Sequence, residues 1–227
     1  MLSPGGRVVD VGCDHGFLDV YLVQTGKMES AIAMDVRKGP LAAATAHVRE
    51  AGLSDRIETR LSDGLNAFQV GEAEKLVCAG MGGPLMQRIL TDDPKKTESF
   101  HELILQPQSE LFEFRAFLRE MGYKIVEERI LIEDGKYYFP MKVVMDQGDQ
   151  SNGRGEKDDI YDRYGELLIR RKDPLLLQYL KEQERIQKSI LAQLNSQAGE
   201  AAEGRTRRLS EVNKEWELLH KAMELMK

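Results

Sequence analysis

The residues Val8-Val9-Asp10-Val11-Gly12-Cys13-Asp14-His15-Gly16 decide the fold of this chain. A run of β-forming residues ends in a glycine-containing turn, and a helical pattern begins at Phe17. This is the sequence form of a strand, a tight turn and a helix N-terminus, where a nucleotide-like ligand can lie close to the backbone. A second apolar run, residues 31–34, ends in Asp35, and an acid at the tip of the next strand can accept hydrogen bonds from ribose hydroxyls. We therefore expect a nucleotide-like cofactor at this turn.

Strand and helix signals alternate after this turn. Five such units predict a parallel, doubly wound sheet, because parallel strands need crossover helices. Two β-rich segments, 124–132 and 137–145, flank Asp134-Gly135 and predict a closing antiparallel hairpin, an ending usual for seven-stranded methyltransferase sheets. The predicted fold is thus α/β, with a Rossmann-like sheet. The strands of the five units are expected at 7–11, 31–34, 56–61, 75–79 and 102–105, and the helices at 17–24, 40–51, from 84 onward and at 110–121.

The last third of the chain has a different pattern. Residues 147–156 are polar and glycine-rich, which is typical of a linker, so we divide the chain into 1–150 and a helical part, 151–227. Two series of residues spaced by three and four predict two helices that pair as a hairpin or coiled coil, within one chain or between two. The series are Leu176, Leu180, Gln183, Gln187, Ile190 and Leu194, and Leu209, Val212, Trp216, Leu219, Met223 and Met226.

Composition narrows the classes of protein. No apolar run approaches the roughly 20 residues that cross a bilayer, and the chain starts without a basic-then-apolar leader, so we expect a cytoplasmic protein with no membrane partner. The net charge of −6 argues mildly against nucleic acid, although the acidic excess lies in residues 1–154 and residues 155–227 are balanced. The four histidines lack ligand spacing, so no metal site is expected. Cys13 and Cys78 are expected to be buried thiols that could lie close together.

Four loop clusters should meet at one edge of the sheet, because the carboxyl ends of parallel strands share an edge. Glycines after the first strand let a ligand approach the backbone, Asp35 would hold ribose, and Asp63 could bind a purine amino group. Asp14 and His15 are unusual inside a glycine loop. Either they serve the structure, as a helix cap and a backbone contact, or they point into the crevice and polarise a substrate base. The clusters are residues 12–16, Asp35, 62–65 and 79–83.

Several of these motifs together resemble the bacterial tRNA (adenine-22 N1)-methyltransferases. The matching segments span about residues 7–145, and the helical C-terminal region fits too. Gly80-Met81-Gly82-Gly83 is the most specific element, because most relatives of the wider fold carry an Asn/Asp-Pro-Pro-aromatic sequence there. The resemblance implies a class I fold, S-adenosylmethionine as cofactor, tRNA as partner and methyl transfer to N1 of an adenine in the D-arm region. The segments are residues 10–16, 62–65, 79–83, 103–107 and 133–137.

The resemblance and the chemistry of the side chains together assign roles to individual residues. Asp14 and His15 are the candidate catalytic residues, since a carboxylate would stabilise the cationic product base. The expected cofactor-binding residues are Asp10, Gly12, Cys13, Asp14, Gly16, Asp35, Asp63, Gly64 and Gly80. The expected substrate-binding residues are Gly80, Met81, Gly82, Gly83, Pro107, Arg207 and Arg208, and the arginines contact phosphate unless they simply cover a solvated helix face.

Two departures and two alternatives accompany this hypothesis. Cys13, Gly16 and Phe17 stand where Ser, Ala and Tyr are more usual, and the family's helical, often basic segment before the first strand is missing, which leaves either a shortened chain or a weaker RNA contact. A nicotinamide-linked dehydrogenase is disfavoured by the absence of G-x-G-x-x-G. A non-catalytic cofactor-binding scaffold, whose coiled coil binds protein or RNA, is the second alternative.

Overall fold

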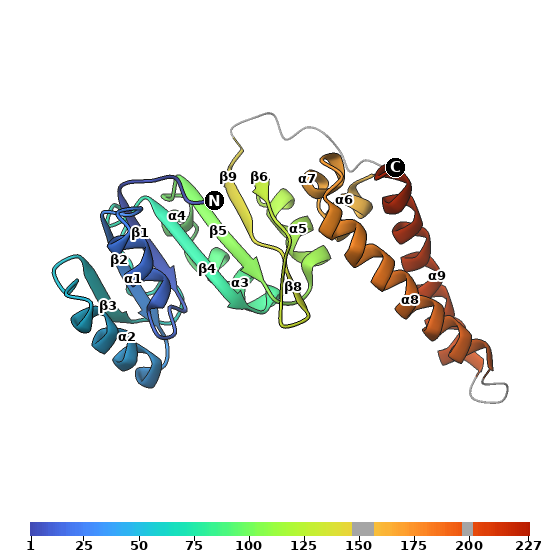
Figure 1. The fold of residues 1–227 in the computed structure, drawn as a ribbon, viewed down its shortest axis with the longest axis horizontal. Helices are drawn as coiled ribbons and strands as arrows, with labels where there is room; N and C mark the ends of the chain where they lie inside the picture. The colour runs from blue at the N-terminus through green and yellow to red at the C-terminus, as the bar shows by residue number, and fades with distance from the viewer. Residues whose placement is uncertain (147–156, 197–201) are drawn as a thin grey trace. The chain divides into compact units, whose positions relative to one another are not determined.

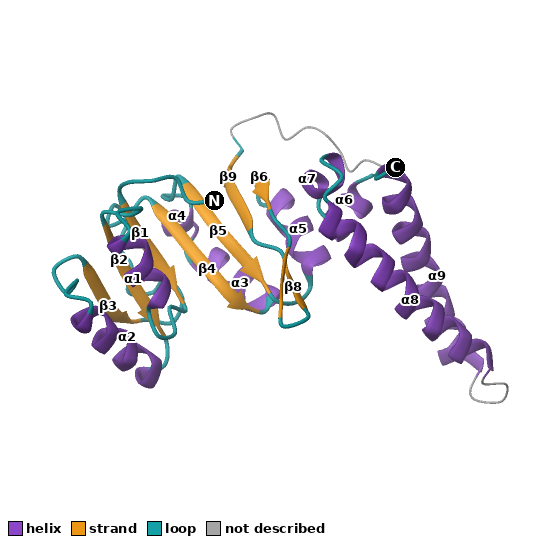
Figure 2. Ribbon diagram, in the orientation of Figure 1, coloured by secondary structure: helices purple, strands orange, loops and turns teal. Residues whose placement is uncertain are grey.

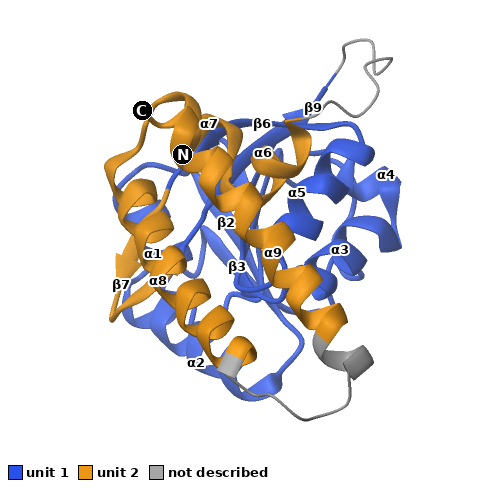
Figure 3. Ribbon diagram, turned by 90° about the vertical axis from the view of Figure 1, so that its right-hand side faces the viewer, with its two compact units in different colours: residues 1–129, 138–150 blue, residues 130–137, 151–227 orange. Residues whose placement is uncertain are grey.

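The computed structural model describes residues 1–146, 157–196 and 202–227. The chain divides into two compact units, Met1–Arg129 with Tyr138–Gln150, and Ile130–Tyr137 with Ser151–Lys227 (Figure 3). The short hairpin at 130–137 therefore groups with the C-terminal unit, whereas a division at residue 150 leaves it in the first part. The linker expected at 147–156 lies outside the described residues.

A seven-stranded sheet forms the centre of the first unit, in the order β3-β2-β1-β4-β5-β9-β6 (Figure 2). Neighbouring strands among the first five run parallel, and β9 is antiparallel to both β5 and β6. This confirms the predicted doubly wound α/β sheet with a closing antiparallel pair. The strands are β1 (Arg7–Val11), β2 (Ser30–Asp35), β3 (Ile57–Leu61), β4 (Lys75–Met81), β5 (Glu102–Pro107), β6 (Tyr123–Glu128) and β9 (Met141–Met145).

Helices cover both faces of this sheet (Figure 1). Side chains alternate between the faces along each strand, so Val9 of β1 belongs to one core cluster and its neighbour Val8 to the other. Helices α1 (Phe17–Gln24) and α2 (Lys38–Glu50) pack on the Val8 side. The Val9 side is covered by α3 (Gly83–Asp92) and α5 (Leu111–Glu120), and the short α4 (Pro94–Thr97) was not expected from the sequence.

The two cysteines fall into different core clusters. Cys13 packs with the α1 and α2 residues, and Cys78 packs with the α3 and α5 residues on the other side of the sheet. Both thiols are buried and free, which confirms that part of the prediction. The idea that they could lie close together is wrong, because the turn at Gly12 carries Cys13 to the face of the sheet opposite Cys78.

The closing hairpin is interrupted, contrary to the two continuous strands expected from the sequence. β6 ends at Glu128, and β7 (Leu131–Glu133) pairs with β8 (Lys136–Tyr138) in a separate two-stranded sheet. Pro140, which has no N–H to donate, precedes β9, and only its carbonyl is used, by the Arg129 N–H at 3.0 Å. The turn at Asp134 and Gly135 has positive φ at both residues, as a two-residue hairpin turn requires.

The second unit is helical, as expected. Its helices are α6 (Asp158–Tyr164), α7 (Glu166–Arg170), α8 (Pro174–Ser196) and α9 (Ala202–Leu225). α8 and α9 pack against each other within this chain, with Leu180 and Leu219 fully buried between them. All residues of both predicted apolar series are buried or half-buried. In the described part of the chain, no helix is both long enough and apolar enough to cross a membrane.

Candidate functional site

The order of the strands reverses between β1 and β4, and this point locates the candidate site. The chain leaves β1 for α1 on one face of the sheet and leaves β4 for α3 on the other. Open α/β sheets bind ligands in the crevice that such a divergence leaves at the carboxyl edge. The two loops touch here, since a Cβ added to Gly12 would lie 2.8 Å from Cε of Met81. Gly12 also has a φ of +80°, and this backbone conformation favours glycine, whereas the flexible end of the Met81 side chain can shift to make room.

The glycine loop is fastened to the tip of β2 by backbone hydrogen bonds. The N–H groups of Gly12 and Cys13 donate to the Met34 carbonyl at 2.8 and 2.9 Å. The Asp35 carboxylate accepts from the Asp14 N–H at 3.2 Å and from the Arg37 N–H at 2.8 Å. Asp35 is only 3% exposed, so in this structure it holds the two loops together. A carboxylate offers about four lone pairs, which leaves acceptor capacity for a ribose hydroxyl.

Asp14 and His15 lie exposed at this edge. Asp14 has a φ of +50°, and its carboxylate pairs with Arg37 at 3.3 Å and with the His15 imidazole at 3.6 Å. The N-cap of α1 is Gly16, with no side-chain hydrogen bond to the helix, so Asp14 does not cap it. The helix-cap alternative is therefore wrong, and the side chain is placed where a ligand could meet it.

Gly16 is a glycine for packing reasons. Its φ is +69°, and an added Cβ would lie 2.9 Å from Cβ of Ala44 in α2. Gly64 likewise has positive φ, and a Cβ added to it would lie 3.1 Å from Cγ1 of Ile89. The helix packing behind these two turns, rather than a bound ligand, accounts for the absent side chains.

Two carboxyl groups are buried beneath the glycine loop. Burial raises the pKa of Asp10 to about 7, an effect that the neighbouring Asp19 carboxyl offsets in part. The pKa of Asp19 is raised more strongly, first by burial and then by the charge of Asp10. Neither Asp19 oxygen has a hydrogen-bond partner in the described part of the chain. Because two adjacent buried carboxylates cannot both ionise, we expect the Asp10–Asp19 pair to hold one proton between them.

The same buried charges act on the Cys13 thiol. Burial raises its pKa, and the nearby carboxylates of Asp19, Asp10 and Asp35 raise it further. The thiol is therefore protonated and chemically quiet, and only a thiolate would be nucleophilic. Asp19 was missed from the sequence, because a polar residue in an amphipathic helix usually faces water.

The loop after β3 lies next to the Asp35 loop. The Ser62 N–H donates to the Asp35 carbonyl at 3.0 Å, and the Ser62 hydroxyl donates to the Gly64 carbonyl at 2.8 Å. Asp63 is half exposed and forms a two-pronged ion pair with Arg88 of α3, at 2.8 and 3.4 Å. The guanidinium of Arg88 holds the pKa of Asp63 below its usual range. Asp63 is thus ionised and oriented, as an acceptor for a purine amino group needs to be.

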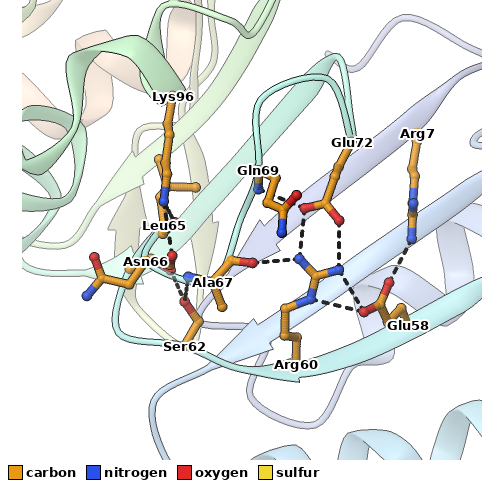
Figure 4. A network of polar contacts seen from close by, with 11 residues as sticks. Arg7, Glu58, Arg60, Ser62, Leu65, Asn66, Ala67, Gln69, Glu72 and Lys96 are labelled. Atoms are coloured by element: carbon orange, nitrogen blue, oxygen red, sulfur yellow. Dashed lines mark hydrogen bonds and ion pairs between the residues drawn. The ribbon is translucent and has the colours of Figure 1, made fainter.

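Ion pairs pin the rest of this loop to β3 (Figure 4). Arg60 binds Glu72 through two hydrogen bonds, at 2.8 and 3.0 Å, and donates to the Ala67 carbonyl at 2.6 Å. Glu58 lies between Arg60 and Arg7 and accepts hydrogen bonds from both. Lys96 reaches across from the end of α4 to the Leu65 and Asn66 carbonyls. Apart from Leu65, none of these residues was expected at the site from the sequence, because their pairing depends on how the loop closes.

The glycine segment after β4 lies against the end of β5. The Gly80 N–H donates to Oε1 of Gln106 at 3.1 Å, and Met81 pairs with Pro107 across the two strands. A Cβ on Gly83 would lie 2.8 Å from the Ser109 carbonyl, so α3 can start here only with glycine. The residues expected to border a substrate, Gly80 to Gly83 and Pro107, are therefore brought together. Gln106 is an addition that the strand pattern alone did not mark.

The remaining predicted substrate residues belong to the second unit. Arg207 and Arg208 both pair with Glu211 of the same helix, at 3.2 and 3.1 Å. Arg170 and Arg171 pair with Glu166 and Asp173 in the same way. Their positive charge is thus partly neutralised. Over residues 1–146, 157–196 and 202–227, no group of three or more His, Cys, Asp or Glu side chains is placed to hold a metal ion.

Together, these loops define the class of protein. A seven-stranded sheet in this order, with a glycine turn at the reversal point and acidic residues at the tips of the next strands, is the architecture of a Rossmann-like class I methyltransferase. A family model described as "TrmK: tRNA (adenine(22)-N(1))-methyltransferase" matches residues 8–219. The chain belongs to this family.

Comparisons with individual relatives support this family assignment. The chain is 32% identical to the tRNA (adenine(22)-N(1))-methyltransferase of Bacillus subtilis over 230 residues, which cover 97% of this chain and 92% of that protein. The crystal structure of the B. subtilis enzyme TrmK aligns with a TM-score of 0.83 at 32% identity, over 97% of this chain and 93% of that one. The Streptococcus pneumoniae protein Sp1610, in complex with S-adenosyl-L-methionine, aligns with a TM-score of 0.80 at 31% identity, over 96% and 94%.

Proposed function

We infer that this chain transfers the methyl group of S-adenosylmethionine to N1 of the adenine at position 22 of tRNA. The observation that carries this inference is the meeting of five strand-end loops at the reversal point of the sheet, in a member of this family. The loops after β1, β2 and β3 are joined to one another by hydrogen bonds, and those after β4 and β5 are joined in the same way.

The residues present fit the cofactor. Gly12 has positive φ and no side chain, so a ligand can reach the backbone of the turn. S-adenosylmethionine carries a sulfonium and an ammonium group, and the acidic side chains around the turn match these positive charges. We assign the methionine part to residues 12–16 over Asp10, the ribose to Asp35, and the adenine amino group to Asp63 with Gly64. The bound cofactor supplies a methyl group that is already activated for transfer.

The chain's own task is to align the target base and exclude misplaced ones. Residues Gly80 to Gly83 and Pro107 form the side of the crevice opposite the cofactor loops, with the Gln106 amide close by. The base has to leave its stack to enter, which costs a few kcal/mol in a paired region. Alignment in line with the methyl group can supply up to roughly 7–11 kcal/mol of the barrier in well-oriented systems.

Asp14 is the residue we assign to the developing charge. Methylation at N1 makes the adenine cationic, and a carboxylate near it stabilises that charge most strongly in the transition state. Asp14 is exposed at the edge of the sheet, and His15 and Arg37 hold its carboxylate on two sides. His15 is a positioning residue for Asp14 in this assignment.

We assign recognition of the tRNA body to the second unit. Arg207 and Arg208 are exposed on α9, and each pairs only with Glu211 among the contacts described, so a phosphate could replace that carboxylate. The chain would act in the cytoplasm, where its substrate is processed.

One experiment tests the function. The protein is incubated with isotopically labelled S-adenosylmethionine and an unmodified tRNA transcript, and the labelled nucleoside is identified and mapped. We expect 1-methyladenosine at position 22, and no label in a transcript with guanine there. Cofactor binding without methyl transfer would instead support the scaffold alternative. A thermal shift with NADH but none with S-adenosylmethionine would support a dehydrogenase.

A further inference from the structure

Three aromatic rings gather beside the glycine loop, and they come from that loop and from α1 and α2, the two helices labelled in Figure 1. Phe17, the first residue of α1, stacks on His47 of α2 with ring centroids 4.5 Å apart and planes 23° from parallel. The His15 ring lies 6.0 Å from Phe17 and 6.2 Å from His47. We call these three residues the ring cluster. Because its members come from the loop and two helices, no single sequence motif contains it.

A hydrogen bond holds the His47 ring of the cluster in place, and the Phe17 ring that stacks on it is exposed to solvent. His47 donates from Nδ1 to the His15 carbonyl at 2.9 Å, because a carbonyl can only accept. This bond ties α2 to the loop and sets the plane of the His47 ring. Phe17 rests on that ring and is nevertheless 64% exposed. The outer face of this ring is therefore open to a flat ligand, while its inner face is held by the His47 ring.

The residues next to the ring cluster indicate which kind of ligand could lie on it. His15 belongs to the cluster and contacts the Asp14 carboxylate, which the proposed function places at the developing charge. The Arg37 guanidinium, which is also exposed, lies on the other side of Asp14 at 3.3 Å and supplies a positive group for a phosphate. Proteins that hold single-stranded RNA combine such cations with aromatic rings on which bases stack.

Resting on the proposed function, we propose that the Phe17 ring, backed by His47 and flanked by His15, is a stacking platform for one nucleobase of the tRNA substrate, next to the target adenine. The target itself has to enter the crevice between the β1 and β4 loops to reach the methyl group. Phe17 stands outside that crevice, on an open surface, so its partner is a neighbouring base. Stacking of this kind accepts any base, because every base has a π-face.

Substitutions at Phe17 test the platform through tRNA binding. The protein is loaded with S-adenosylhomocysteine, and its Kd for an unmodified tRNA transcript is measured for Phe17→Ala, Phe17→Tyr and wild type. We expect Phe17→Ala to weaken binding about 10-fold, and Phe17→Tyr, which keeps the ring, to bind within 2-fold of wild type. His47→Ala, which removes the ring beneath, should give an intermediate loss. Tyr21→Ala is the matched control, since Tyr21 is 59% exposed on the same helix but lies outside the ring cluster.

Calorimetry with S-adenosylhomocysteine alone and thermal melting separate the platform from a folding defect. Both should agree with wild type for Phe17→Ala. Wild-type tRNA affinity in Phe17→Ala, or an equal loss in Tyr21→Ala, would overturn the proposal. A transcript with an abasic residue at the target position tests whether Phe17 holds the neighbouring base or the target base. The Phe17→Ala loss should persist with that transcript, and its disappearance would show that Phe17 holds the target base instead. These binding measurements stand even if wild type transfers no methyl group, an outcome that would refute the proposed function alone.

Discussion

The two sides of the proposed cofactor cradle are built from different forces. On the β1–β2 side, backbone N–H groups and the buried Asp35 hold the glycine loop, and the Asp10 and Asp19 carboxyls are buried beneath it. On the β3–α3 side, partly exposed ion pairs hold the loop that carries Asp63. The first side is held by hydrogen bonds to a buried carboxylate and to backbone carbonyls, whereas the second side is held by ion pairs that solvent reaches.

This difference bears on how each side responds to its surroundings. Buried hydrogen bonds are little affected by salt, while exposed ion pairs are screened at physiological ionic strength. The glycine loop should therefore respond to substitutions that change its shape and to pH through the buried carboxyls. The Asp63 loop should respond to salt and to loss of a single arginine.

The largest expected effect comes from a substitution that changes the shape of the glycine loop on the β1 side. Gly12→Val would place a branched side chain at φ +80° and within 2.8 Å of the Met81 methyl group. We expect the Kd for S-adenosylhomocysteine, measured by calorimetry, to rise at least about 100-fold, which corresponds to about 2.7 kcal/mol. Gly39→Ala is the control, since nothing lies within 4 Å of an added Cβ there. Equal affinities in Gly12→Val and wild type would remove this loop from the cofactor site.

The second prediction separates chemistry from binding at the same loop. Asp14→Ala should lower kcat for tRNA methylation by roughly 100-fold, because the carboxylate acts mainly on the charge of the transition state. Its Kd for S-adenosylhomocysteine should change less than about 3-fold. Asp63→Asn should show the reverse pattern, with weaker cofactor binding and a smaller change in kcat at saturation. Unchanged turnover in Asp14→Ala would refute the assignment.

The third prediction concerns the buried carboxyl pair. Since the folded-state pKa of Asp10 is raised to about 7, the folded protein binds more protons than the unfolded chain between about pH 4 and 7. Stability should therefore fall as pH rises through this window. Asp19→Asn keeps a hydrogen-bond donor for Asp10 and removes one acid. Its Tm should drop less than that of wild type between pH 5 and pH 8, by several degrees.

A control completes this comparison. Asp55→Asn changes an exposed aspartate and should leave the pH dependence of Tm as it is in wild type. If Asp19→Asn and Asp55→Asn melt alike at both pH values, the two buried carboxyls do not share a proton.

The smallest expected effect comes from a substitution in the ion-pair network on the β3 side. Arg60→Gln removes the hydrogen bonds to Glu72 and Ala67, and the Arg60 side chain is about one-fifth exposed, so we expect a loss of about 1–2 kcal/mol in unfolding free energy. The Kd for the cofactor product should rise a few-fold, and more salt should narrow the gap to wild type. Arg7→Gln, at the outer end of the same network, should cost less than half as much. Equal costs would mean that the network acts only as a surface charge pattern.

Much of the fold was predictable because local signals and tertiary packing agree. The strand at Arg7–Val11 and the helix at Phe17–Gln24 match their predicted ranges, since a buried apolar run and a glycine turn leave few other conformations. Both apolar series in α8 and α9 face each other for the same reason. Even the split hairpin contains the predicted Asp134-Gly135 turn.

For the site, the sequence predicted which residues lie at the strand ends, but not the contacts that those residues make. Asp35 was expected at a strand tip, but its burial and its bonds to two backbone N–H groups depend on the approach of the Asp14 loop. Asp63 was expected to face a ligand, and its pairing with Arg88 required α3 to lie alongside. The hairpin was expected to be continuous, but the pairing of β6 with β9 ends at Glu128 and Met141, next to Pro140.

Residue types and their spacing along the chain thus specified the doubly wound sheet, its glycine turn and the acids at its strand ends, because hydrophobic periodicity and backbone freedom act over a few residues. Folding in three dimensions chose which side chains those acids meet: Asp19 under Asp10, Arg88 beside Asp63, and His47 beneath Phe17. These pairings join residues 9 to 30 positions apart in the sequence, and short-range polar and aromatic contacts form only when helix packing has brought both partners within a few ångströms.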